Sequence, residues 1–60
     1  MKKTYRIHRD YLRLMLTGYE ANTFVAGELK NAGFDLDRPV SERYDEMADE
    51  LIYTQTQANA

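Results

Sequence analysis

The chain has 60 residues, of which 43% are apolar and 30% are charged, and its formal net charge at pH 7 is −2. A domain of this size buries only about 60% of the surface that its unfolded chain exposes. Cysteine is absent, which excludes disulfides and thiolate metal sites and leaves self-association as a way to enlarge the core. We therefore expect one domain over residues 1–53, a polar tail over residues 54–60, and a homodimer.

Charge is distributed unevenly along the sequence. Residues 1–13 carry five cationic side chains against Asp10, a sum of +4, whereas residues 14–60 carry three cationic and nine acidic side chains, a sum of −6. Such a molecule is an electrical dipole that meets partners through charged faces. Charged residues near the start of the chain interrupt the apolar run that a secretory signal peptide needs. No apolar run approaches the roughly 18 residues that span a bilayer. We expect a cytoplasmic protein without a membrane partner.

The first predicted element is a helix over residues 4–17, because apolar residues occupy about half of its circumference. Gly18 followed by Tyr19 is typical of a helix end. The remaining side of this helix would carry a basic ridge formed by Lys2, Arg6, Arg9 and Arg13. An alternative stays open, since the alternating residues of 4–8 and 11–17 also fit two strands joined by a turn at Arg9 and Asp10.

The second predicted element is a helix from Asn22 or Thr23 to about Ala32. Gly33 is suited to the left-handed residue that ends a helix, and in such an ending the next residue packs back on the one five positions earlier. The sequence therefore predicts a contact between Phe34 and Leu29.

The third predicted element is a helix that starts near Pro39 or Ser41 and reaches residue 52. Its apolar residues recur at helical spacing and would share one face. The opposite side would carry an acidic face formed by Glu42, Asp45, Glu46, Asp49 and Glu50. Together the three elements predict an all-α fold, either a small three-helix module or a helical hairpin, which dimerises through the apolar side of residues 4–17.

No residue pattern indicates catalysis. His8 lies among arginines, and with no second histidine and no cysteine the usual transition-metal sites lack ligands. Ser41 is the only serine, and no glycine-rich phosphate loop follows a strand-like segment. We expect no enzymatic activity, no metal and no cofactor. Tyr11 and Tyr44 are expected in the core.

These observations favour a small non-catalytic regulator or inhibitor of the phage or plasmid type. Its acidic face would engage a basic surface of another protein, and the basic ridge would serve as a second contact. Binding of nucleic acid through the ridge is the alternative, and it is not favoured because the sequence pI is about 5.2.

A third possibility comes from the order of several short segments. The matching positions are Asp10-Tyr11-Leu12, Thr23-Phe24, Lys30-Asn31, Phe34-Asp35-Leu36, Tyr44, Ala48-Asp49 and Leu51. This order resembles the Hha-type nucleoid modulators over about forty residues. Glu50 and Leu51 stand where that family has histidine and arginine, and the C-terminal tryptophan region is missing. The resemblance implies a helical modulator of transcription that binds the silencer H-NS, with Asp49 contacting a basic residue.

Overall fold

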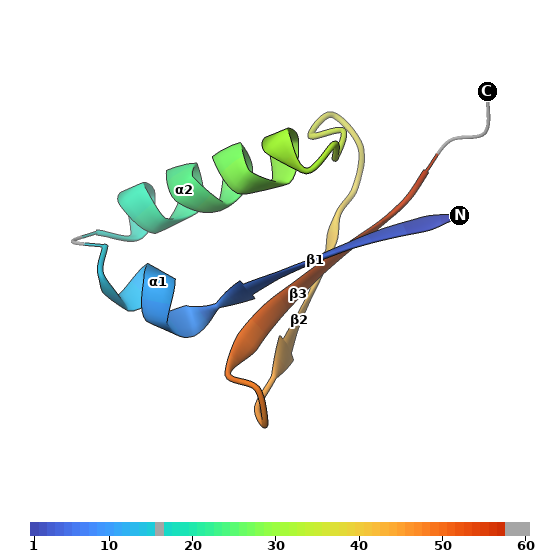
Figure 1. Ribbon diagram of the computed structural model, residues 1–60. Coiled ribbons are helices and arrows are strands. Elements are labelled where there is room, and N and C mark those ends of the chain that lie inside the picture. The colour runs from blue at the N-terminus through green and yellow to red at the C-terminus, as the bar shows by residue number, and fades with distance from the viewer. Residues whose placement is uncertain (16, 58–60) are drawn as a thin grey trace.

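The computed structural model describes residues 1–15 and 17–57. Within these residues the chain forms β1 (Lys2–His8), α1 (Arg9–Arg13), α2 (Gly18–Asn31), β2 (Ser41–Asp45) and β3 (Glu50–Thr56). The strands form an antiparallel sheet in the order β1-β3-β2, and both helices lie on one side of it (Figure 1). The fold is therefore α+β, and the all-α prediction is wrong.

The largest difference concerns residues 40–52, which form a β-hairpin instead of a helix. The carboxylate of Asp45 stabilises the turn by accepting hydrogen bonds from the N–H groups of Met47 (3.1 Å) and Ala48 (3.3 Å). The turn ends at Asp49, whose φ is +54°. Met47, which the helical spacing placed on the apolar face, is fully exposed. The β-branched and aromatic residues of β3 favour a strand, and pairing on both of its edges outweighs the local helical spacing.

The predicted helix over residues 4–17 is wrong in its first half, which is β1. Tyr5 and Ile7 alternate toward the helices and contact the core, as the alternative strand interpretation implied. The partner strand is β3 rather than residues 11–17. After β1, α1 begins with His8 as its N-cap, whose ring Nδ1 accepts a hydrogen bond from the N–H of Asp10 (3.1 Å). The apolar helix side that was expected to form a dimer is therefore not built.

The start of α2 was also misplaced. Gly18, interpreted as a helix end, is the first residue of α2, because the hydroxyl of Thr17 accepts a hydrogen bond from the N–H of Glu20 (3.1 Å). Threonine followed three positions later by glutamate is the sequence pattern of an N-terminal capping box. That pattern is present here and outweighs the Gly-Tyr signal.

The end of α2 agrees with the prediction. Gly33 has a φ of +93°, and the N–H groups of Gly33 and Phe34 donate to the carbonyls of Lys30 (3.0 Å) and Leu29 (2.9 Å). This is the hydrogen-bond pattern of a Schellman ending. Phe34 and Leu29 both belong to the buried core, so the predicted contact is confirmed.

The core lies between the sheet and α2. Its buried members are Ile7, Leu29, Phe34 and Tyr53. Because side chains alternate along a strand, the odd-numbered residues of β1 and β3 face the helices. The even-numbered residues face the other way, together with the odd-numbered residues of β2 that pair with them. We call this opposite side, which neither α1 nor α2 covers, the uncovered face.

β3 extends into the segment that was expected to be a polar tail. Its residues up to Thr56 pair with β1, and Gln55 is only 2% exposed. Residues 58–60 of that predicted tail lie outside the described residues. In the described part of the chain, neither helix combines the length and apolarity that crossing a membrane requires.

Candidate functional site

The carboxylates of the predicted acidic face do not share one side of the fold. Asp45 and Glu50 lie opposite each other on the uncovered face. Glu42 lies on the helix side of β2, Glu46 lies in the turn, and Asp49 contacts α1. The helix that would have aligned them is not formed, so the geometry proposed for that contact does not apply.

The predicted basic ridge is divided between two places. Lys2 and Arg6 lie on the uncovered face, whereas Arg9 and Arg13 belong to α1. Arg6 pairs with Glu50 (3.3 Å) and Asp45 (3.6 Å) on the uncovered face. The two halves of the ridge therefore meet different surroundings.

Asp49 fastens α1 to the hairpin. Its carboxylate accepts a hydrogen bond from the hydroxyl of Tyr44 (2.7 Å) and pairs with the guanidinium of Arg13 (2.8 Å). Its carbonyl accepts the N–H of Arg9 (2.9 Å), and the Arg9 guanidinium lies 5.3 Å from the centre of the Tyr44 ring. The hydrogen bond from Tyr44 and then that from Arg13 hold the pKa of Asp49 below its usual value, and the same bonds raise the pKa values of Tyr44 and Arg13. Arg9 and Arg13 thus serve the fold itself.

One group of possible metal ligands lies in this network. Single ligand atoms of His8, Asp10 and Asp49 lie within 4.8 Å of one another. The guanidinium of Arg13 already contacts both carboxylates, and the His8 ring accepts a backbone N–H. A cation would have to displace Arg13 from its two partners, so the arrangement is that of an ion-pair cluster and we assign no metal to it.

The free edge of β1 presents unused backbone groups. The N–H of Arg9 donates to the carbonyl of Asp49, and the N–H of Gln57 donates to the carbonyl of Met1. In an antiparallel pair these hydrogen-bonded positions alternate with positions whose backbone groups point away. The N–H and C=O groups of even-numbered β1 residues, including Thr4 and Arg6, therefore point outward, where no other described strand pairs with them.

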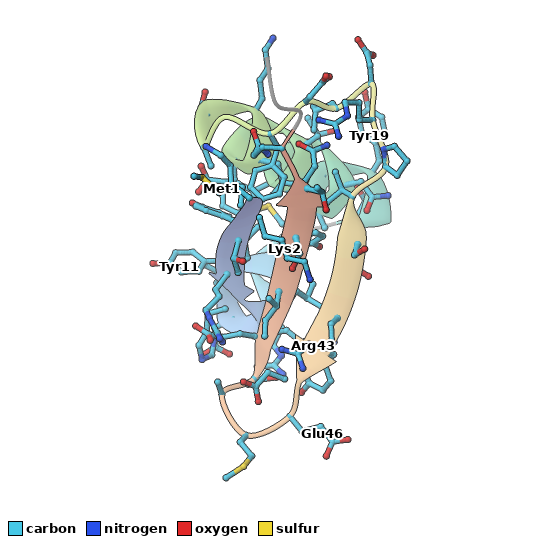
Figure 2. All side chains as sticks on the ribbon, turned by 90° about the vertical axis from the view of Figure 1, so that its right-hand side faces the viewer. Met1, Lys2, Tyr11, Tyr19, Arg43 and Glu46 are labelled. Carbon is cyan, nitrogen blue, oxygen red and sulfur yellow. The ribbon has the colours of Figure 1, made fainter. Side chains whose placement is uncertain are left out.

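A groove of about 400 Å³ follows this free edge. Four consecutive residues of β1 line the groove, together with one residue of α1 and two of α2. They are Tyr5, Arg6, Ile7 and His8 of β1, Tyr11 of α1, and Phe24 and Glu28 of α2. Tyr11, which we expected in the core, is 58% exposed and stacks on Phe24 with ring centres 6.4 Å apart. Figure 2 shows Tyr11 projecting beside the outer edge of β1. The groove thus offers aromatic surface next to the outward backbone groups.

The formal charges of β1 are all positive, although Arg6 is already paired with Glu50 and Asp45. The strand carries Lys2, Lys3 and Arg6 and no carboxylate. The ammonium of Lys3 donates to the carbonyl of Ala32 (2.9 Å) at the end of α2, where a cation is favourable. Lys2 has no ion-pair partner within residues 1–15 and 17–57. Anything bound at this edge meets a cationic strand.

Sequence reasoning missed Arg38, Arg43 and Phe24 as surface residues of interest. Arg43 lies in the same cross-strand row as Arg6, with Ile52 between them, and Ile52 is 3% exposed although it lies on the uncovered face. The alkyl parts of flanking arginines can cover an apolar side chain in this way. Residues 41–45 are polar except for Tyr44 and show no alternation that would have predicted this row.

Comparisons of the chain with protein-family models, with curated proteins and with solved structures gave no match. The resemblance to the Hha-type nucleoid modulators is not tested by them and stays a prediction.

Proposed function

We propose that this protein is a small non-catalytic binding module that adds an extended segment of another protein to the free edge of β1. The observation that supports this most is the coincidence of outward backbone groups with an aromatic groove along the same edge. In strand addition, main-chain hydrogen bonds supply affinity and pockets for alternate side chains supply specificity. Acting in the cytoplasm, such a module would regulate or inhibit the protein whose segment it holds.

The charges of β1 indicate the chemistry of the partner. A second copy of β1 paired antiparallel with Thr4 opposite Thr4 would place Lys2 against Arg6, and like charges opposite each other are unfavourable. A segment that alternates acidic with apolar residues is complementary instead. Its carboxylates would lie on the side of Lys2 and Arg6, and its apolar side chains would enter the groove beside Tyr5 and Tyr11.

A pair of synthetic peptides tests this proposal. One alternates glutamate with valine, and the other carries lysine in place of each glutamate. Fluorescence anisotropy should show binding of the glutamate peptide and at least tenfold weaker binding of the lysine peptide, a difference of about 1.4 kcal/mol. Equal affinities, or no binding of the glutamate peptide, would contradict the proposal.

Two tyrosine variants locate the binding surface. Tyr11→Ala removes an aromatic wall of the groove, and tyrosine is enriched among the interface residues whose truncation costs more than about 1 kcal/mol, so the affinity should fall about tenfold. Tyr19→Ala is the matched control, since Tyr19 is 81% exposed and does not line the groove. Figure 2 shows the two rings on different sides of the molecule. Equal effects of both substitutions would place binding elsewhere.

A proline variant tests the backbone contact itself. Thr4→Pro removes an outward N–H and leaves the hydrogen bonds to β3 intact, since odd-numbered residues make those. The variant should fold and bind the glutamate peptide weakly. Circular dichroism verifies the fold, and full peptide affinity in the folded variant would refute a backbone contact at this position.

A further inference from the structure

A second hollow, of about 530 Å³, lies on the uncovered face and is distinct from the groove beside β1. Its polar lining consists of three cations, three hydroxyls and one amide: Lys2, Arg38, Arg43, Ser41, Thr54, Thr56 and Gln55. None of the described residues that line it is acidic. Figure 2 looks onto this face, with Lys2 and Arg43 in view on it.

The wall of the hollow is held in place by Gln55. Its side-chain amide accepts the N–H of Asp35 (2.8 Å) and donates to the carbonyl of the same residue (2.7 Å). Arg38, three residues further, donates from Nη2 to the carbonyl of Thr56 (2.7 Å). The Arg38 guanidinium is thereby fixed beside β3, with other N–H groups left to donate.

The charge of the uncovered face is divided between its two ends. Asp45 and Glu50 lie at the hairpin end, where they pair with Arg6. At the hollow, neither Arg38 nor Arg43 has an ion-pair partner among residues 1–15 and 17–57. Three cations therefore gather in one hollow while the chain as a whole carries −2.

We infer that this hollow binds the sugar–phosphate backbone of a single-stranded nucleic acid. Guanidinium groups match phosphate oxygens as paired donors, and hydroxyl groups add single hydrogen bonds. The hollow has the volume of a ligand site rather than of a single ion. No aromatic side chain lines it, so the contacts are to phosphate and sugar rather than to the bases, and such contacts carry no sequence information.

The salt dependence of binding follows from the number of cations. Three phosphates neutralised on a single strand give a slope of log affinity against log salt of about −2. A fourfold rise in salt should therefore weaken binding about twentyfold. Arg43→Gln removes one contact and should reduce the slope by about 0.7.

Anisotropy of a labelled oligo(dT) at low salt tests this inference. Arg43→Gln should weaken binding and flatten the salt slope, and Lys30→Gln should change neither, since Lys30 is exposed on α2 and does not line the hollow. Absence of binding at low salt, or equal effects of the two variants, would overturn the inference. Competition by polyglutamate as strong as that by oligo(dT) would also overturn it in favour of an acidic protein.

The same variants separate this inference from the proposed function. Arg43→Gln should retain full affinity for the glutamate–valine peptide, because Arg43 is on β2 and does not line the groove beside β1. Tyr11→Ala should retain affinity for oligo(dT), because Tyr11 does not line the hollow. The two proposed surfaces share Lys2, but Arg43 belongs to one and Tyr11 to the other, so loss of both activities in either variant would contradict their separation.

Discussion

Gln55→Leu should destabilise the protein strongly although it replaces a polar side chain with an apolar one. Gln55 is 2% exposed, and its amide satisfies both backbone groups of Asp35 at 2.8 and 2.7 Å. Each hydrogen bond contributes about 1 kcal/mol net, and partners left without a bond in a partly buried place add a further penalty. We expect a loss of about 3 kcal/mol in the free energy of unfolding. A domain of this length has only about 3–9 kcal/mol in total.

Urea unfolding followed by far-UV circular dichroism measures this loss, and the midpoint of thermal unfolding should fall by about 15 °C. Thr56→Leu on the same strand is the control, since Thr56 is exposed; it should change the free energy by about 0.5 kcal/mol or less. A Gln55→Leu protein as stable as this control would refute the assigned role of the amide.

Three further predictions concern two glycines and two titrating groups. Gly33 has a φ of +93°, so Gly33→Ala should lower the free energy of unfolding by about 1–2 kcal/mol. At Gly27 an added methyl meets open space, so Gly27→Ala should raise the free energy of unfolding by about 0.5–1 kcal/mol. Equal changes of the two variants in urea titrations would contradict this. The hydrogen bond from Tyr44 lowers the pKa of Asp49 in the folded protein. The ionised Asp49 therefore contributes its full stabilisation above the unfolded pKa of about 4, and this stabilisation is lost as pH falls through the lower folded pKa. Asp49→Asn removes the titrating group, so acid unfolding curves of this variant should be flatter. Burial raises the pKa of Tyr53, so stability should fall as pH rises above about 10, and Tyr53→Phe should reduce that fall.

The sequence predicted the ending of α2, although not its start, because the signals of that ending are local. Gly33 and Phe34 complete their hydrogen bonds with residues of the preceding turn, so neighbouring residues carry the information. The hairpin of residues 41–56 depends instead on pairing between β3 and β1, in which each residue meets a partner more than forty positions away. The alternation of Leu51, Tyr53 and Gln55 was present, but a glutamine on the core side hid it. The burial of Gln55 is explained only by its hydrogen bonds to the backbone of Asp35 in the loop after α2.

The candidate surfaces were predicted in part. The positive charge of the first residues was evident, and Lys2 and Arg6 do lie together on β1. The sequence did not show which of these cations form ion pairs. Arg13 pairs with Asp49, and Arg6 pairs with Glu50, only once the strands have paired. Spacing along the chain does not encode these contacts, and the groove beside β1 exists only because α1 and α2 pack against the strand.

Hydrogen exchange along β1 tests the central claim most directly. In the free protein the N–H groups of Tyr5 and Ile7, which point to β3, should exchange slowly, and those of Thr4 and Arg6 should exchange rapidly. Saturation with the glutamate–valine peptide should slow exchange at Thr4 and Arg6 at least tenfold and leave Tyr44, on the free edge of β2, unchanged. Protection of Tyr44 instead, or no change at Thr4 and Arg6 while the peptide is bound, would contradict strand addition at β1.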